Sequence, residues 1–142
     1  MIDWPIAELL PHAGDMILLD GVERFDDDNV ETVLQVRADG LLNTADGSLP
    51  AWVGVEIMAQ SVAAFAGCHA RQADQPVELG FLLGTRSYQC NVEAFPAGAD
   101  LRVRANAEGV RVENADVTDA DIQASNGVIH AINRVLTPPE QI

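Results

Sequence analysis

The sequence predicts a single α+β domain in which a curved antiparallel sheet wraps around one long buried helix. Residues 51–68 form an apolar run of helical length whose one charged side chain is Glu56. Most of the remaining chain consists of short alternating segments that are typical of strands. At 142 residues the chain has the length of one domain, so we expect one unit over 1–142.

The segments before the long helix predict a short leading helix and a hairpin. Residues 3–10 place apolar side chains at helical offsets, and Pro5 suits a first helical turn. The apolar run 16–19 is the first strand candidate, and the polar stretch 26–29 predicts a turn. From Val30 onward, apolar and polar residues alternate, which is typical of a second strand.

A long loop and the central helix follow. Residues 37–50 are rich in Gly, Asp and Asn, and long ordered loops tend to be functional. Ser48 is the expected N-cap of the helix. The helix, roughly 50–70, is nearly long enough to cross a bilayer, but Glu56 inside it favours a buried core helix instead.

The segments after the helix predict only strands. Four ranges are candidates: 79–90, 101–107, 110–117 and 128–136. The acidic stretch around Asp116, Asp119 and Asp121 is expected to be a strand end or a turn. A sheet that follows a hairpin and wraps one helix in this order is the hot-dog arrangement.

The composition limits the possible partners and cofactors. The formal net charge is −14, with 22 acidic and 8 basic residues, so nucleic acid and anionic membranes are poor partners. All basic residues are arginines, and no metal, nucleotide or flavin motif is present, so we expect no cofactor. The first twenty residues lack the basic region of a signal peptide, which favours a cytoplasmic location. Cys68 and Cys90 are expected to be buried free thiols.

Several motifs resemble those of the β-hydroxyacyl-acyl carrier protein dehydratases, a hot-dog family. The segment LLPHAGDMILLD at 9–20 is similar to the leading helix and LPHR-type motif of that family. EIMAQ at 56–60 is similar to its E-A-M-A-Q helix segment. GFLLG at 80–84 and FPAG at 95–98 fall where the family has a strand and a proline-glycine turn. The chain resembles most closely a divergent branch, the dehydratase-like proteins found with aryl polyene biosynthesis genes.

The resemblance implies an enzyme that removes water from a 3-hydroxyacyl group held on acyl carrier protein or coenzyme A. It assigns Glu56 as the general acid, since desolvation on an apolar helix favours the protonated carboxyl. Ala51 matches the oxyanion-hole residue of the family, and with Trp52 it opens the helix, where unpaired N–H groups can bind developing negative charge. Gln60, one turn after Glu56, is placed to orient the carboxyl.

The sequence departs from the family at one position. The helix carboxylate is usually paired with a histidine about fourteen residues earlier, and here that position falls at Leu42. Because 37–50 contains no histidine, His12 is the candidate replacement base. A local structural role is the alternative for His12.

Other residues have structural interpretations. For Glu56, the alternative to catalysis is a carboxylate paired with an arginine such as Arg86 or with groups across a subunit interface. His69 and His130 are expected to be structural. Trp52 is expected to pack at an interface or at the mouth of a substrate tunnel.

Two further functions stay open at this point. A thioesterase would need only Glu56 and the start of the helix, whereas a non-catalytic subunit would support a partner dehydratase. A homodimer or a heterodimer with a related hot-dog protein is expected, since edge strands seek partners. An acidic carrier would be repelled by this chain unless arginines such as Arg102 and Arg104 form a local basic surface.

Overall fold

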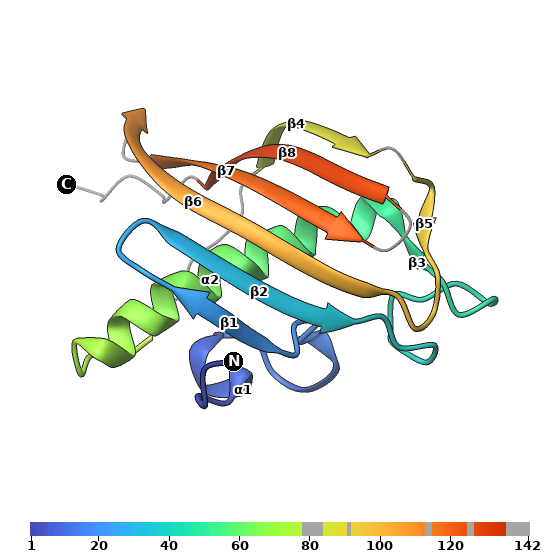
Figure 1. Cartoon of the computed structure of the whole chain (residues 1–142), viewed down its shortest axis with the longest axis horizontal. Helices are drawn as coiled ribbons and strands as arrows, with labels where there is room; N and C mark the ends of the chain where they lie inside the picture. The colour runs from blue at the N-terminus through green and yellow to red at the C-terminus, as the bar shows by residue number, and fades with distance from the viewer. Residues whose placement is uncertain (78–83, 91, 113–114, 125–126, 136–142) are drawn as a thin grey trace.

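The computed structural model describes residues 1–77, 84–90, 92–112, 115–124 and 127–135, with side chains described within 1–77 and 92–105 (Figure 1). A six-stranded antiparallel sheet curves over one long helix, α2, which runs behind it in this view. The predicted α+β hot-dog arrangement is confirmed.

The elements follow the predicted order. They are α1 (Ile6–Leu9), the 3-10 turn η1 (Gly14–Met16), β1 (Gly21–Phe25), β2 (Asn29–Gln35), β3 (Leu49–Pro50), the 3-10 turn η2 (Ala51–Val53), α2 (Gly54–Gln72), β4 (Gly84–Cys90), β5 (Ala94–Phe95), β6 (Asp100–Val112), β7 (Ala115–Ala124) and β8 (Gly127–Val135). The large sheet has the order β1-β2-β6-β7-β8-β4, and β3 pairs separately with β5. This small β3–β5 pair lies beside the start of α2 (Figure 1).

The core lies between the inner face of the sheet and α2. Successive residues of a strand point to opposite faces, so Val30, Thr32 and Leu34 face the helix while Glu31 faces outward. The Thr32 hydroxyl hydrogen-bonds the Ser61 hydroxyl of α2 at 2.7 Å, which satisfies both buried groups. The helix contributes buried apolar side chains to this core, among them Ile57, Met58, Ala64 and Cys68.

Helix α2 is long and apolar, as predicted. With η2 it spans Ala51–Gln72, and this length, with an 18-residue stretch whose mean hydropathy is 1.3, would suffice for a membrane span. Half of this stretch is buried inside the molecule. The sheet therefore supplies an apolar partner for one side of the helix.

Some predicted boundaries before the helix are wrong. The first strand begins at Gly21, whereas the apolar run 16–19 is a connection whose polar backbone groups bind the Gln60 side chain. The leading helix is a single turn, Ile6–Leu9. Ser48 is not the helix N-cap; it bonds Thr44 and Asp46 instead, and the helix starts through the 3-10 turn η2.

The predicted strands after the helix also need correction. The ranges 101–107 and 110–117 were expected to be two strands, but β6 continues through Val112 with an irregular register between Glu108 and Arg111. In the acidic stretch, Asp116 lies at the start of β7 as predicted for a strand end, but Asp119 and Asp121 lie inside this strand. Residues 79–83 of the first candidate lie outside the described residues.

Gly67 brings α1 and α2 into close contact. A Cβ added at Gly67 would overlap the carbonyl oxygen of Leu9, and the backbone atoms of Leu9 cannot move aside as a flexible side chain would. Position 67 is therefore restricted to glycine by the neighbouring backbone.

We expect Gly67→Ala to destabilise the protein by about 1–2 kcal/mol, because the overlap costs more than the helix propensity that alanine gains. Urea unfolding would measure it. Ala66→Gly, at an exposed position of the same helix, is the control and should lose about 1 kcal/mol from propensity alone. A stabilised Gly67→Ala would contradict the close contact.

Candidate functional site

The structure places His12 beside Glu56. The His12 Nε2 atom lies 3.4 Å from Glu56 Oε1, and the two side chains are 26% and 35% exposed. His12 comes from the loop after α1, and Glu56 lies in the first turn of α2. Glu56 is thus less buried than the sequence predicted, and an imidazole shares its environment. Such a pair can exchange a proton with a bound molecule.

Gln60 joins the segment that carries His12 to the helix that carries Glu56. Its Nε2 donates to Glu56 Oε1 at 3.1 Å and to the Met16 carbonyl at 2.7 Å. Its Oε1 accepts the Leu18 N–H at 2.9 Å. The side chain is fully buried, so a single amide fixes the carboxylate and ties the 11–20 segment to α2.

Gln60 is therefore a positioning residue. The predicted orientation of Glu56 by Gln60 matches the geometry. Its amide is enclosed and engaged at both ends, which fits a residue that acts through Glu56.

The His12 ring has one unusual feature. Its Nδ1 atom is buried, and among the described residues it is the one buried side-chain nitrogen or oxygen without a hydrogen-bond partner. Leaving such an atom unpaired costs about 1–3 kcal/mol. Unsatisfied polar groups concentrate at sites that serve function rather than stability.

The start of the helix differs from the prediction. The Ala51 N–H donates to the Glu93 carbonyl at 3.0 Å, so it is engaged in holding the β3–β5 region rather than free for a substrate oxygen. The next N–H groups of the helix belong to Trp52 and Val53. The Trp52 side chain is largely exposed.

The loop that lacks the usual histidine is ordered by its own side chains. Leu42, at the position of that histidine, packs against the hydrophobic core. Asp46 accepts hydrogen bonds from Ser48 and Thr44, and these bonds lower the pKa of its carboxyl from 3.8 to about 2. No histidine side chain from this loop reaches Glu56, since the loop contains none.

The remaining candidates have structural surroundings or lie outside the described side chains. His69 Nε2 is 3.0 Å from the Asp26 carbonyl oxygen, and its ring packs edge-on against Phe25 and Phe65. Cys68 is a buried free thiol, and burial raises its pKa to about 11. The side chains of Arg86, Cys90 and His130 lie outside the described part.

A cavity of about 170 Å³ lies between the 11–20 segment and the loop after β2. Its lining includes Leu18, Leu34 and Leu49 as apolar walls and Asp15 and Arg37 as charged groups. Leu18, which lines the cavity, donates its N–H to Gln60, so the cavity lies next to the residue that positions Glu56.

Comparisons with known proteins identify the relatives. A model of the ApeP-like family, described as ApeP dehydratase, matches residues 4–142. A chain of the dehydratase heterocomplex ApeI:P from Xenorhabdus doucetiae is 29% identical, with a TM-score of 0.83 over 96% of this chain and 93% of that chain. These findings confirm the predicted resemblance to hot-dog dehydratases of the aryl polyene type.

Two other relatives carry less weight. The E. coli PaaI protein from the phenylacetic acid degradation operon is 11% identical, with a TM-score of 0.53 over 81% of each chain, which shows the fold alone. Protein sll1483 from Synechocystis sp. is 46% identical over 43 residues. That match spans 30% of this chain and 24% of the cyanobacterial protein.

We expect Gln60→Leu to lower the free energy of unfolding by at least about 1–3 kcal/mol, because the Leu18 N–H and the Met16 carbonyl lose their partner. Chemical denaturation would measure the loss. Gln72→Leu, the same change at the exposed end of α2, should stay within about 0.5 kcal/mol of the wild type. Equal effects of the two changes would refute the bridging role.

We expect the Asp46 carboxyl to titrate near pH 2 rather than near 3.8. Because the folded pKa is depressed, the loop contacts stabilise fully above about pH 4 and are lost as the pH falls through about 2. NMR titration of the carboxyl carbon would measure the midpoint, with Asp46→Asn used to assign the signal. A midpoint near 3.8 would show that the hydrogen bonds are absent in solution.

Proposed function

The chain belongs to the ApeP-like dehydratase family, and from that premise we propose that it removes water from a 3-hydroxyacyl thioester carried on an acyl carrier protein. The observation that carries the proposal is the 3.4 Å approach of His12 Nε2 to Glu56 Oε1. This pair offers an acid and a base in a chain that lacks the histidine usually found opposite the carboxylate.

In the proposed reaction, neutral His12 takes the α-proton of the thioester at Nε2. Glu56 in its acid form donates its proton to the 3-hydroxyl, which leaves as water while the double bond forms. The product is the 2-enoyl thioester. Because the two side chains are adjacent, the proton on His12 can pass to Glu56 and restore the starting state. A 3.4 Å separation is long for a hydrogen bond, and catalytic contacts commonly shorten once substrate is bound.

The thioester oxygen gains enolate charge in this reaction and needs donors. Since the Ala51 N–H is engaged by Glu93, we assign this role to the following N–H groups at the start of the helix, those of Trp52 and Val53. The positive end of the helix dipole supports the same charge.

A thioesterase remains the second enzymatic reading of a lone helix carboxylate. The family match and the Glu56–Gln60 contact favour dehydration over hydrolysis, because the amide fixes the carboxyl beside an imidazole rather than toward open solvent. The likeness to PaaI concerns the fold and carries no argument for hydrolysis.

We also propose that the chain works in a complex with a second hot-dog protein. Its structural relative is part of a dehydratase heterocomplex, and Trp52 and Leu41 expose large apolar side chains. An exposed tryptophan is typical of protein interfaces, where the partner covers its large ring.

We expect Glu56→Gln and His12→Asn each to lower the rate of dehydration by about 10²–10⁴, the usual contribution of a general acid or base. Spectroscopic detection of the 2-enoyl thioester would measure turnover. Glu93→Gln and His69→Asn are the matched controls and should retain activity. In the double variant Glu56→Gln/His12→Asn, a loss no larger than the greater single loss would indicate that the residues act as one unit.

A second assay tests whether the activity needs the partner protein. The protein would be assayed alone and mixed with a dehydratase-like protein encoded beside it, and we expect water loss in at least one condition. Hydrolysis of the thioester without water loss in either condition would overturn the dehydratase proposal. Full turnover of the complex with Glu56→Gln would instead make this chain a supporting subunit.

A further inference from the structure

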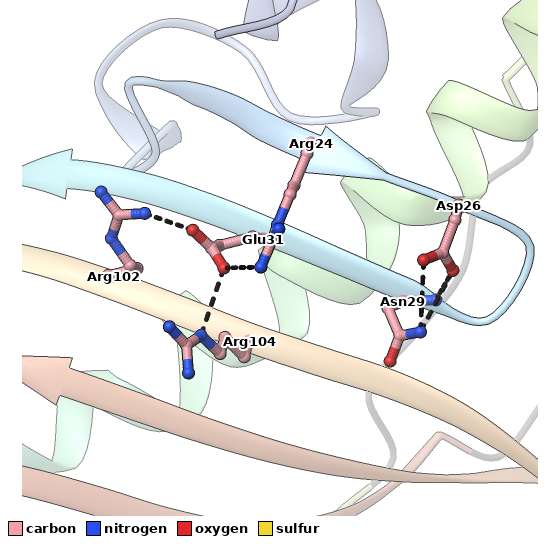
Figure 2. Close-up of polar contacts among 6 residues, drawn as sticks. All are labelled: Arg24, Asp26, Asn29, Glu31, Arg102 and Arg104. Atoms are coloured by element: carbon pink, nitrogen blue, oxygen red, sulfur yellow. Dashed lines mark hydrogen bonds and ion pairs between the residues drawn. The ribbon is translucent and has the colours of Figure 1, made fainter.

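The arginines on the outer face of the sheet are engaged by one carboxylate. Arg24 Nη2 and Arg104 Nε each lie 3.2 Å from Glu31 Oε2, and Arg102 contacts Glu31 Oε1 (Figure 2). Strand β7 places Asp121 opposite Arg104, which adds a second acidic residue to this face. An acidic carrier would need Arg102 and Arg104 as a local basic surface, but both are turned toward Glu31.

The rest of the described part offers no basic surface either. Its two other arginines each contact a carboxylate, Arg37 that of Asp20 and Arg71 that of Glu8. The chain contains no lysine, and its net charge is −14. An acyl carrier protein is itself acidic, so like charges disfavour its binding to the described surface. A carrier-bound substrate therefore has to be presented by another chain.

The cavity of about 170 Å³ between the 11–20 segment and the loop after β2 has an apolar floor and an acidic rim. Leu34, Val36 and Leu49 line it and are buried. Asp15 and Asp39 line it too, and both are exposed. A group that rests on this floor is therefore bordered by two negative charges.

Exposed apolar side chains extend the floor toward solvent. Leu41 lines the cavity and is 63% exposed, and Met16, which follows Asp15, is 49% exposed. Among the described lining residues Arg37 is the one cation, and it contacts Asp20. An apolar pocket bordered by charge has the form of an anchor site at a protein interface.

The volume of the cavity sets the size of its occupant. An engineered cavity of about 150 Å³ holds one benzene molecule. A cavity of about 170 Å³ therefore has room for one large apolar side chain. The acidic rim favours basic residues on either side of that side chain, because complementary charges fix the register of a contact and repel acidic alternatives.

We propose that this cavity anchors a second hot-dog chain, which places one large apolar side chain on Leu34 and Leu49 and basic residues against Asp15 and Asp39. The inference rests on the complex proposed above and supplies the chemistry of its partner. A second copy of this chain is a poor occupant, because it brings a net charge of −14 and its described arginines are engaged. The acidic carrier is disfavoured for the same reason and docks on the basic partner instead.

The probe is the dehydratase-like protein encoded beside this chain. Biolayer interferometry with the immobilised full chain measures its association at low and at high salt. We expect the association rate constant to fall about tenfold or more between about 0.02 M and about 0.5 M salt, because screening weakens the attraction between the acidic rim and the basic partner. Acyl carrier protein, applied alone to the same immobilised chain, should show no binding.

The variant Asp15→Asn/Asp39→Asn removes the acidic rim. The control Asp27→Asn/Asp28→Asn removes the same charge from the exposed turn between β1 and β2. We expect the rim variant to raise Kd about five- to tenfold, the size of two exposed ion pairs, and the control to stay within about twofold.

The apolar part of the contact is tested in the same assay. Leu41→Ser should raise Kd about tenfold, because the partner loses an exposed apolar side chain at the edge of the cavity. Ala45→Ser, at an exposed position of the same loop, is the control and should stay within about twofold. Circular dichroism checks that each variant is folded.

Association that ignores salt, or that weakens equally in Asp27→Asn/Asp28→Asn, would overturn the proposal, as would no association at all. Binding of the carrier to this chain alone, or self-association of this chain, would assign the cavity to another occupant if Leu41→Ser abolished it. None of these measurements needs turnover. A salt-dependent complex without water loss would refute the dehydratase proposal alone, whereas water loss by a complex that ignores salt would refute the inference drawn from the cavity.

Discussion

The arrangement of the candidate site depends on the buried amide of Gln60. A glutamine side chain offers one acceptor oxygen and two donor hydrogens. Here the oxygen accepts the Leu18 N–H, and the amide hydrogens are donated to the Met16 carbonyl and the Glu56 carboxylate. Without this amide, the 11–20 segment would have no polar anchor to α2 at this point. His12 belongs to that segment, so its place beside Glu56 follows from the same set of bonds.

The sequence predicted the fold well because its main signals are local. An apolar run of helical length predicts the buried helix, and alternating segments such as 30–34 predict strands, without any information from distant residues. Strand β7 was missed because its alternation relies on Ala120 and Ala124, and alanine contributes little apolar contrast against the aspartates. The run 16–19 looked like a strand because nothing in the sequence shows that a side chain forty residues away will take its backbone hydrogen bonds.

The candidate site was partly predictable for the same reason. Glu56 could be found from its position in an apolar helix, and His12 by elimination once the loop after β2 proved to lack histidine. Engagement of the Ala51 N–H by Glu93 depends on the pairing of β3 with β5, which no short motif reveals. The ion pairs of Glu31 with Arg24, Arg102 and Arg104, drawn in Figure 2, depend on the register of three strands, since Arg102 lies 71 residues from Glu31.

The close packing of α1 on α2 has a consequence for chemistry. His12 follows Leu9 by three residues, and the height at which Leu9 rests on α2 is fixed by the missing side chain of Gly67. Both residues are therefore positioned by α2. Glu56 lies on this helix, and His12 is held against it through α1 and Pro11. The position of His12 thus depends in part on a contact about three helical turns from Glu56, at which an added methyl group would meet the backbone of Leu9.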